Sequence, residues 1–456
     1  MIPFTEVGIM DRNSEYRGVP PGVLMENAGK ALAEELLSRY PGEKFLFLCG
    51  TGNNGGDGYV AARYMGKERA SVFLAKGRDG VNSPLAQENL DKVDCNIVEV
   101  PDMSRYVIVD CLLGTGISGT VREPYRSLIQ EINQGKAPVV SIDVPSGLGG
   151  DVTVQPDVTI TFHDIKEGMT PENSGEMIVK DIGVPDKAVE YTGPGETLLY
   201  PYPSKSSHKG ENGRVLIIGG GPYTGAPALA AQGAYRTGVD LVHLAVPSRI
   251  ALTVAGFDPH FVVRPLKGDV LSSAHVERLV EMAEDFHAVV MGPGLGRDEA
   301  TIEALGRLME DITIPKVIDA DALLAVRGSA IAGEAVLTPH EEEFKTITGK
   351  EASKEAADTL AEEMEVTVLL KGEVDYITDG KRYKFNDFGT PAMTVGGTGD
   401  ILAGVVGALL AKGLNPFDAA RLGVYMTCRA GEMAFEDHGW GVLPGDIKEY
   451  ISRTMG

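Results

Sequence analysis

The chain has 456 residues, a length that predicts two or three domains, each with its own hydrophobic core. Its hydrophobic content of 43% is typical of globular domains, and no apolar run approaches the roughly 18 residues that a membrane-spanning helix needs. The formal net charge of -23 argues against nucleic acid as a partner, because phosphate backbones bind basic surfaces. We therefore expect neither nucleic-acid nor membrane partners.

The first residues and the cysteines indicate a cytoplasmic location. Residues 1–6 lack the basic and then apolar order of a secretory signal. The four cysteines, Cys49, Cys95, Cys111 and Cys428, have no metal-binding spacing, and two of them lie in apolar, strand-like runs. We interpret them as buried thiols of a protein in a reducing compartment.

A segment rich in Pro, Gly and Ser, at residues 191–209, interrupts the pattern of apolar runs. It is the best domain boundary and predicts domains at residues 1–200 and 201–456. On both sides of it, short β-branched runs alternate with longer helical stretches, which is typical of a mostly parallel sheet covered by helices on both faces. We therefore predict an α/β fold with two doubly wound domains. No residue-level repeat relates the two halves, so they are separate domains rather than a duplication.

Eleven short apolar runs are predicted as strands. In the first domain these are residues 45–49, 71–75, 106–110, 139–143 and 158–162. In the second domain they are residues 215–218, 241–246, 288–291, 316–318, 335–337 and 366–370.

A glycine-rich segment, residues 50–58, follows the first strand and precedes a plausible helix at 59–65. Ligands of open α/β sheets bind at the carboxyl ends of strands, and glycines let them approach backbone amides closely. The glycine spacing is not that of an ordinary dinucleotide loop, so a standard dinucleotide fold is the weaker interpretation. Asn53, Asn54 and Asp57 add side-chain oxygens that a plain phosphate loop does not need.

Two further strand ends carry polar residues, at 110–120 and at 143–147. Their carboxylate, amide and hydroxyl oxygens are the ligands that hard cations prefer. Each segment alone is explained equally well by a tight turn with a capping Asp. Because three such segments follow strands of one predicted sheet, they favour a shared binding site.

Together with Met25-Glu-Asn-Ala-Gly29 and residues 161–168, these segments form five motifs whose order resembles the NAD(P)HX epimerase family over residues 1–190. NAD(P)HX is NADH or NADPH hydrated at C6 of the nicotinamide ring. The resemblance implies a Rossmann-like sheet, a potassium ion bound by Asn54, Asp110 and Ser146, and proton transfer by Asp143 and Lys166. It also implies substrate contacts by Asn53, Asn54, Gly55, Gly56, Asp57, Gly114, Thr115, Gly116, Ile117, Ser118, Gly119, Thr120 and Asp143.

The second domain repeats the pattern of polar or glycine-rich segments at strand ends. These segments are residues 207–213, 219–229, 292–296, 319–323, 338–344 and 371–372. A further segment, Gly397-Thr398-Gly399-Asp400, follows them along the chain. Its nearly bare amides precede an apolar helix predicted at 401–411, an arrangement that binds phosphate. Asp400 would then be a general base beside a phosphoryl group, although an Asp at this place can also simply cap the helix.

This ordered series resembles the ribokinase-like NAD(P)HX dehydratase family over residues 205–456. The resemblance implies a ribokinase-like sheet, with Asp400 as the base and Glu343 in a network of Mg²⁺ and phosphate. Substrate contacts would come from Ala226, Gly294, His340 and Asp400. Contacts to ADP or ATP would come from Lys371, Gly372, Glu373, Val374, Asp375, Gly397, Thr398 and Gly399. One departure is Pro444-Gly445 before Asp446, where a small polar residue is expected, so that loop has no assigned nucleotide contact.

The two resemblances imply a bifunctional repair enzyme. The first domain would interconvert the R and S epimers of NAD(P)HX, and the second would dehydrate the S epimer with ADP, or alternatively ATP. Two other interpretations stay open: a ribokinase-like kinase that releases a phosphorylated product, and a first domain that only binds a ligand or a protein. We expect small-molecule nucleotide partners and a homo-oligomer, while the preference between NADHX and NADPHX is left open.

Overall fold

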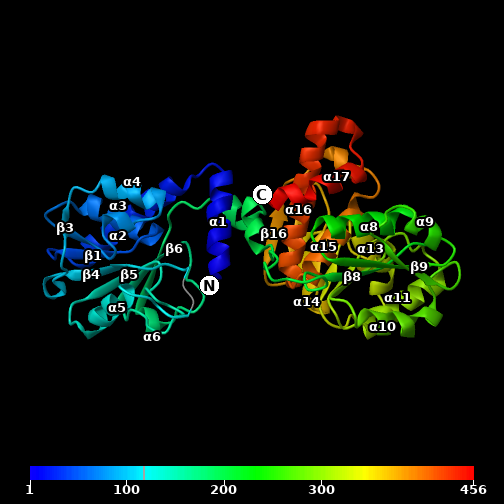
Figure 1. Cartoon of the computed structure of the whole chain (residues 1–456), viewed down its shortest axis with the longest axis horizontal. Helices are drawn as coiled ribbons and strands as arrows, with labels where there is room; N and C mark the ends of the chain where they lie inside the picture. Colours follow the sequence, from blue (N-terminus) through cyan, green and yellow to red (C-terminus); the bar gives the residue numbers. More distant parts are fainter. Residues whose placement is uncertain (117–118, 456) are drawn as a thin grey trace. The chain divides into compact units, whose positions relative to one another are not determined.

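The computed structural model describes residues 1–116 and 119–455, which form two compact units, Met1–Val189 and Glu190–Gly456 (Figure 1). The division comes before residue 200 because the segment after Val189 packs on the second unit. The Thr192 amide donates to the Phe385 carbonyl at 2.7 Å, and Glu196 is buried 3.9 Å from Arg421. The segment rich in Pro and Gly therefore belongs to the second unit.

The first unit contains a seven-stranded sheet of described residues, all parallel, in the order β3-β2-β1-β4-β5-β6-β7. This is a doubly wound order, and its direction reverses between β1 and β4, the place where such sheets bind ligands. The strands are β1 (Phe45–Cys49), β2 (Ala70–Leu74), β3 (Asn96–Val98), β4 (Val107–Cys111), β5 (Val139–Ile142), β6 (Val158–Phe162) and β7 (Glu176–Lys180).

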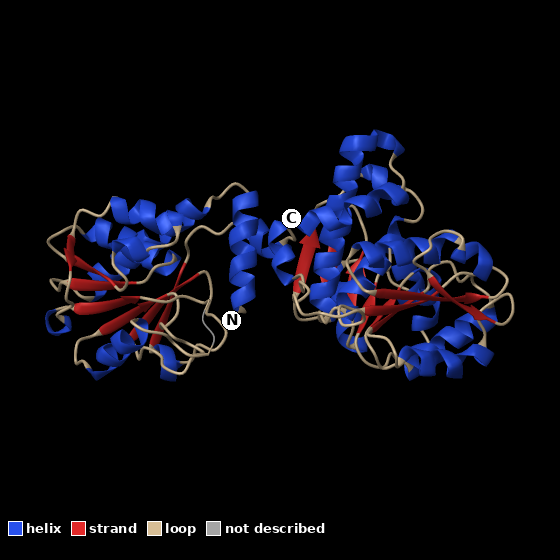
Figure 2. Cartoon of the chain, viewed as in Figure 1, coloured by secondary structure: helices blue, strands red, loops and turns tan. Residues whose placement is uncertain are grey.

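Helices cover both faces of this sheet, as Figure 2 shows. Phe45 and Phe47 of β1 pack in the cluster under α2, α3 and α4, while Leu46 and Leu48 pack on the opposite side against α5. Alternate residues of a strand point to opposite faces, so a strand covered on both sides is apolar throughout. The helices are α1 (Phe4–Tyr16), α2 (Pro21–Arg39), α3 (Asn53–Met65), α4 (Pro84–Asp91), α5 (Tyr125–Gln134), α6 (Pro171–Ser174) and α7 (Asp186–Glu190).

Helix α3 begins at Asn53, six residues before the start predicted from the sequence, so much of the glycine-rich segment is helical. Gly50 is required by a close approach of two strand ends: a Cβ there would lie 1.8 Å from the Leu112 carbonyl oxygen. Gly55 packs in turn against Gly50, with its Cβ position 2.5 Å from the Gly50 oxygen. These glycines bring the end of β1, the end of β4 and the start of α3 together.

The second unit contains a nine-stranded sheet of described residues in the order β10-β9-β8-β11-β12-β13-β14-β15-β16. Strands β8 to β14 are parallel, and the β14-β15-β16 end is antiparallel. The order again reverses at one point, between β8 and β11. The strands are β8 (Arg214–Ile218), β9 (Leu241–Pro247), β10 (Val262–Leu266), β11 (Ala288–Met291), β12 (Lys316–Ile318), β13 (Ala335–Leu337), β14 (Thr367–Leu370), β15 (Asp375–Thr378) and β16 (Tyr383–Asn386).

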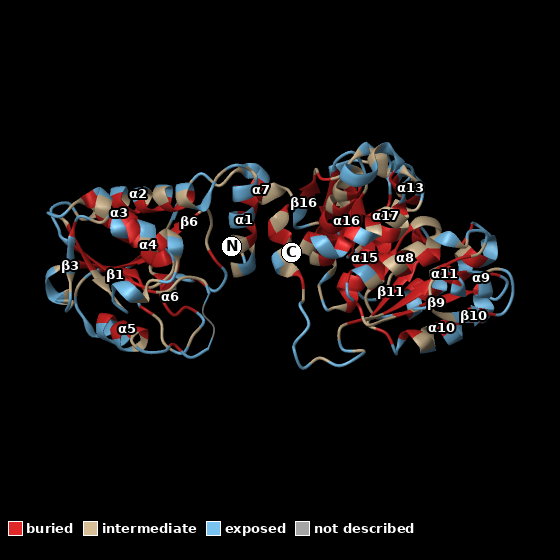
Figure 3. Cartoon of the chain, turned by 45° about the horizontal axis from the view of Figure 1, so that its top comes forward, coloured by how far each residue is buried: buried red, intermediate tan, exposed pale blue. Residues whose placement is uncertain are grey.

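Helices α8, α9, α15, α16 and α17 cover one face of this sheet, and α10 to α14 cover the other. Every residue of α15 from Ile401 to Ala411 is buried, and Figure 3 shows this central helix in the colour of buried residues. Its partner α8 approaches to backbone contact: a Cβ on Gly404 would lie 1.9 Å from the Ala230 oxygen, and one on Gly233 would lie 2.6 Å from the Ile401 oxygen. The helices are α8 (Gly225–Arg236), α9 (Ala251–Ala255), α10 (Val276–Ala283), α11 (Glu299–Asp311), α12 (Leu323–Val326), α13 (Glu341–Thr348), α14 (Lys354–Met364), α15 (Thr398–Ala411), α16 (Pro416–His438) and α17 (Pro444–Tyr450).

The α/β prediction with two doubly wound sheets is confirmed, and all eleven predicted strands form, with ends within one residue of those expected. Five strands were missed: β3, β7, β10, β15 and β16. Four of them are the outer strands of their sheets, where one side of the strand is unpaired and apolar residues are fewer. β10 also contains Pro265, which weakens a strand pattern.

All four cysteines are free thiols, as predicted; Cys49, Cys95 and Cys111 are also buried as predicted, whereas Cys428 is only partly buried. Among the helices of residues 1–116 and 119–455, none combines the length and the apolar composition needed to cross a bilayer.

Candidate active sites

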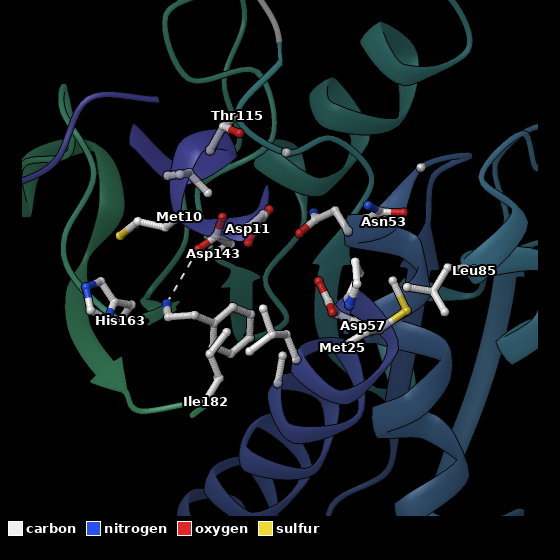
Figure 4. A pocket seen from close by; sticks show the side chains of 18 of the residues that line it. Met10, Asp11, Met25, Asn53, Asp57, Leu85, Thr115, Asp143, His163 and Ile182 are labelled. Atoms are coloured by element: carbon white, nitrogen blue, oxygen red, sulfur yellow. Dashed lines mark hydrogen bonds between the residues drawn. The ribbon is translucent and has the colours of Figure 1, made fainter. Parts of the chain in front are cut away.

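A cavity of about 500 Å³ opens in the first unit where the strand order reverses. Its side chains converge from the ends of several strands and from helices α1, α2, α3 and α4 (Figure 4). Seven residues singled out from the sequence line it: Asn53, Asn54, Asp57, Gly114, Thr115, Asp143 and Lys166. The cavity therefore collects residues from four of the five N-terminal motifs, together with Met25 and Ala28 of the fifth.

Other residues predicted to contact the substrate lie elsewhere. Gly55 and Gly56 are buried packing positions of α3, and a Cβ on Gly56 would lie 2.6 Å from the Met25 methyl carbon. Gly116, Gly119 and Thr120 do not line the cavity, and Gly119 forms a bridge with Gly150 instead. Ile117 and Ser118 lie outside the described residues.

Asp143 and Lys166 form an ion pair on the cavity wall. Asp143 directly follows β5 with a φ of 61°, a left-handed conformation that is uncommon for residues other than glycine. The Lys166 side chain is only 2% exposed, and its Nζ also donates to Thr161 Oγ1 at 2.8 Å and to the Phe162 carbonyl at 2.7 Å. The two predicted proton-transfer residues are thus held together, with the carboxylate open to the cavity.

Two further carboxyl groups face this cavity, and the sequence interpretation had missed one of them, Asp11. The Asp11 residue as a whole is exposed, but its carboxyl group is partly enclosed by the cavity wall; this enclosure, followed by the nearby Asp143 charge, raises its pKa to about 6, although Lys166 opposes the shift. Burial likewise raises the pKa of Asp57 well above its usual range. The sequence did contain a signal for Asp11. Val7, Met10 and Asp11 have the spacing of one helix face, so a carboxyl group lies on the same face as apolar side chains.

Two of the three predicted potassium ligands contact the Leu113 carbonyl oxygen, and the third, Asp110, contacts one of these two, Ser146. Asn54 Nδ2 donates to the Leu113 oxygen at 3.2 Å, and Ser146 Oγ lies 3.1 Å from it and 2.5 Å from Asp110 Oδ1. Asp110 is fully buried, which raises its pKa, while hydrogen bonds from Ser146, Ser141 and the Leu112 amide favour its charged form. Carboxylate, hydroxyl, amide and carbonyl oxygens fit a hard monovalent cation, which would also balance the buried charge. Within the part of the chain that the structure describes, no group of three His, Cys, Asp or Glu residues could hold a metal ion.

In the second unit, Asp400 lies in the first turn of α15 and borders a cavity of about 600 Å³. Gly397 precedes the helix with a φ of 108°, and a Cβ there would lie 2.6 Å from Leu229 Cδ1, so glycine is required. The cavity lies at the point where the strand order reverses, between the starts of α8 and α15. Four predicted site residues line it: Ala226, Gly294, Gly397 and Asp400.

Asp400 has the electrostatic environment of a general base. Burial, reinforced by the charges of Asp319 and Asp321, raises its pKa to about 7, while the Lys371 ammonium lowers it. Lys371 Nζ lies 3.2 Å from Asp319 Oδ1 and 3.9 Å from Glu343 Oε2, and 3.5 Å from where a Cβ on Gly399 would be. A base that is half ionised at neutral pH therefore stands beside a cation at a helix N-terminus.

His340 has a structural role in addition to its predicted one. Its Nδ1 accepts hydrogen bonds from the Glu342 and Glu343 amides at 3.2 and 3.3 Å, and Glu343 Oε2 accepts from the His340 amide at 2.9 Å. His340 and Glu343 thus cap α13. Both also line a smaller cavity of about 250 Å³, and Ala320 lines both this cavity and that of Asp400. The imidazole side chain is 53% exposed, so its free edge stays available.

The segment from Lys371 to Asp375 is a hairpin loop between β14 and β15. Asp375 is buried and points into the protein: it accepts from the Gly372 amide at 3.1 Å and from Asn386 Nδ2 at 2.9 Å, and burial raises its pKa to about 6. Glu373 and Val374 form the tip of the loop, away from the residues that line the Asp400 cavity. Thr398 Oγ1 donates to the Val395 carbonyl at 3.1 Å, within the turn that starts α15. Of this loop, only Lys371 reaches Asp400.

Comparison with known proteins matches the chain to two families. Residues 21–168 match the YjeF-related protein N-terminus, and residues 215–453 match NAD(P)H-hydrate dehydratase. The chain is 40% identical over 490 aligned positions to the bifunctional NAD(P)H-hydrate repair enzyme Nnr of Pyrobaculum aerophilum, covering 99% of this chain and 97% of the relative. The protein of the same name from Methanothermobacter thermautotrophicus is 39% identical, with 99% and 94% covered.

Solved structures resemble the second unit. A hypothetical protein from Streptococcus mutans has a TM-score of 0.53 at 26% identity, covering 58% of this chain and 98% of its own. The ADP/ATP-dependent NAD(P)H-hydrate dehydratase of Bacillus subtilis, co-crystallised with ATP and Mg²⁺, has a TM-score of 0.51 at 23% identity, covering 58% and 97%, and shares the fold. Over its whole length, this chain belongs to the family of bifunctional NAD(P)H-hydrate repair enzymes.

Proposed function

We propose that the chain restores hydrated nicotinamide nucleotides to NAD(P)H in two steps, with the first unit epimerising NAD(P)HX at C6 and the second dehydrating the S epimer. Membership of the repair-enzyme family supports both activities. The observation that carries the proposal is Asp400, a carboxyl group with a pKa of about 7 at the start of α15 and beside Lys371. Its position fits the activation of a hydroxyl group for phosphoryl transfer.

Dehydration has to overcome a poor leaving group, because hydroxide does not leave C6 readily. Asp400 takes the proton of the C6 hydroxyl as its oxygen attacks the terminal phosphorus of ADP, and the bond to the bridging oxygen breaks to give AMP. Inorganic phosphate then leaves C6 while a proton leaves C5, and the dihydropyridine is restored. The first amides of α15 and the Lys371 ammonium face the charge of the transferring phosphoryl group.

ADP as the phosphoryl donor, with ATP as the alternative, and Mg²⁺ as the metal are parts of the same proposal. The B. subtilis dehydratase crystallised with ATP and Mg²⁺ supports the metal. Magnesium in such sites is held mainly by phosphates and one or two carboxylates, so Glu343 and Asp319, both beside Lys371, fit this role. When bound, the metal would supply charge stabilisation of the phosphoryl group.

In the first unit, Asp143 is the proposed base and potassium the proposed cation. The cation would be held by Asn54, Asp110 and Ser146: Asn54 and Ser146 both contact the Leu113 carbonyl oxygen, and Ser146 Oγ also contacts Asp110. It would hold the ends of β4 and β5 in place beneath the cavity. The four free thiols support a reducing, cytoplasmic location. A homo-oligomer remains our expectation, which gel filtration of the purified chain would test.

The test is a dehydration assay with an epimer mixture of NADHX, with ADP and ATP run in parallel. Recovery of reduced-nicotinamide absorbance together with equimolar phosphate release is expected. Asp400→Asn should bind nucleotide but lose nearly all recovery, while Asp269→Asn, an exposed carboxylate of the same unit, should match wild type. A stable phosphorylated product without NADH would instead show the rival function, a ribokinase-like kinase. Wild-type activity in Asp400→Asn would refute the role of this base.

The same assay tests the first unit. Wild type should consume both epimers, whereas Asp143→Ala should consume only the S epimer plus the spontaneous conversion measured without enzyme. Complete consumption by the variant, faster than that background, would contradict the role of Asp143. If wild type itself leaves the R epimer at the background rate, the first unit is a binding module.

A further inference from the structure

Asp11 is placed in the epimerase cavity by contacts of the segment before it. The Ile2 amide donates to the Ile165 carbonyl at 2.9 Å, and the Glu167 amide donates to the Ile2 carbonyl at 2.9 Å. These bonds pair the start of the chain with the residues on either side of Lys166. Helix α1 follows directly, and its Val7, Met10 and Asp11 line the cavity. The placement of Asp11 is therefore tied to that of Lys166 by the backbone.

The charged groups around Asp11 come from three other elements: Asp57 of α3, Asp143 after β5, and Lys166 after β6. Figure 4 shows the Asp11 and Asp143 carboxyl groups in the same part of the cavity, where the dashed line marks the ion pair of Asp143. His163 also lines the cavity, and burial lowers its pKa, so it is neutral near pH 7. Lys166 is bound to Asp143, and no hydrogen bond or ion pair of Asp11 is found among residues 1–116 and 119–455. Asp11 is thus a carboxyl group that no neighbour engages.

We propose that Asp11 is a second catalytic residue of the epimerase, the general acid that works opposite Asp143. This inference rests on the proposed epimerase function of the first unit. The C6 carbon of NAD(P)HX carries both a hydroxyl group and the ring nitrogen N1, so it can open to an aldehyde. Asp143 takes the hydroxyl proton, the C6–O bond becomes a carbonyl, the C6–N1 bond breaks, and Asp11 gives its proton to N1.

Closure of the ring completes the epimerisation and restores both residues. Rotation about the C5–C6 bond presents the other face of the aldehyde to N1. N1 then attacks C6, Asp11 takes the proton back from N1, and Asp143 returns a proton to the oxygen. No atom or electron is gained or lost, so the cycle needs no co-reactant.

Asp11 suits this role better than Asp57. An acid that must donate and recover a proton in each cycle works best when its pKa is close to the working pH. The pKa of about 6 for Asp11 meets this condition, whereas burial raises the pKa of Asp57 well above its usual range. Asp11 is therefore better suited to exchange a proton in each cycle.

The experiment follows conversion of R-NADHX to S-NADHX by the full chain without ADP, so that dehydration does not occur. In Asp11→Asn, we expect kcat to fall by about 100-fold or more, the usual contribution of a general acid, with KM little changed. In wild type, kcat should fall as the pH rises above about 6, and the variant should lose this dependence. Asp11→Glu should recover part of the rate. Glu15→Gln, on the same helix and likewise exposed but outside the cavity, is the control and should match wild type.

The outcomes separate this inference from the proposed function. A wild-type chain that does not interconvert the epimers would refute the epimerase function itself. A wild-type chain that does so, while Asp11→Asn keeps its kcat and its pH dependence, would refute the role of Asp11 alone. A raised KM with unchanged kcat would make Asp11 a binding residue and also overturn the inference. Chemical denaturation of the same samples, followed by circular dichroism, shows whether the first unit of each variant is folded.

Discussion

Replacing Asp400 with asparagine should stabilise the folded second unit at alkaline pH while it removes the proposed dehydratase base. The pKa of this carboxyl group rises from 3.8 to about 7 on folding, mainly because of burial. Between these two values the folded chain binds a proton that the unfolded chain releases. The contribution of Asp400 to stability is therefore fully present below pH 3.8 and is lost as the pH rises to 7. Asparagine carries no charge and avoids this loss.

The size of the effect follows from the shift of about three pKa units at roughly 1.4 kcal/mol each. The free energy of unfolding of Asp400→Asn should exceed that of wild type by about 2 kcal/mol at pH 5 and by about 4 kcal/mol at pH 8. These values are upper limits, because the unfolded chain is more compact than a free peptide and the side chain is only partly enclosed.

Urea unfolding of the full chain at the two pH values measures this difference. The single tryptophan, Trp440, belongs to the second unit and packs edge-on against Phe435 at 5.3 Å, so its fluorescence follows that unit. Asp269→Asn is the control for the loss of an exposed charge and should show no gap that grows with pH. If Asp400→Asn were no more stable than wild type at pH 8, or if the gap were equal at both pH values, the electrostatic argument would be wrong.

Three further predictions concern packing, pH and the cation. Gly50→Ala should lower the free energy of unfolding of the first unit by about 1–3 kcal/mol, because its Cβ would meet the Leu112 oxygen. Gly52→Ala, with open space around it, should have little effect. Chemical denaturation followed by circular dichroism compares the two variants. The dehydratase kcat should rise about tenfold per pH unit below pH 7 and level off above it, as Asp400 ionises, and a flat profile would contradict a base with this pKa. Replacing potassium with lithium should slow epimerisation and leave dehydration of the S epimer unchanged; equal epimerisation rates in both salts would argue against the cation site. Ser146→Ala should raise the potassium concentration needed for half-maximal epimerisation.

The interior of both sheets could be predicted from the sequence because strands covered on both faces form continuous apolar runs. The outer strands could not, since their residues meet solvent and follow no apolar pattern: β3, for example, has two exposed residues among its three. The start of α3 was placed six residues late because glycines usually interrupt helices. Here they are tolerated by the contacts of Gly50 and Gly55 with neighbouring backbone.

The site residues divide in a similar way. Asp143, Lys166 and Asp400 could be named as candidates because each lies in a motif at a strand or helix end, and the fold places each of them at a cavity. Asp11 lies in no such motif, and its proposed role depends on its nearness to Asp143 and Lys166, more than 130 residues away in the chain, which only the fold brings close. The inward orientation of Asp375 was also missed, because the sequence does not show that Asn386 approaches it from β16.

The contact between α8 and α15 bears on how the dehydratase site accommodates its ligands. Gly404 and Gly233 let the two helices touch through their backbones, so their separation depends on covalent dimensions and not on side-chain rotamers. The starts of both helices form the walls of the Asp400 cavity. The site is therefore preorganised on two sides before any nucleotide arrives, and little ordering entropy is lost there on binding. Adjustment to different nucleotides has to come from the segments that complete the cavity wall, residues 222–224 and 320–321.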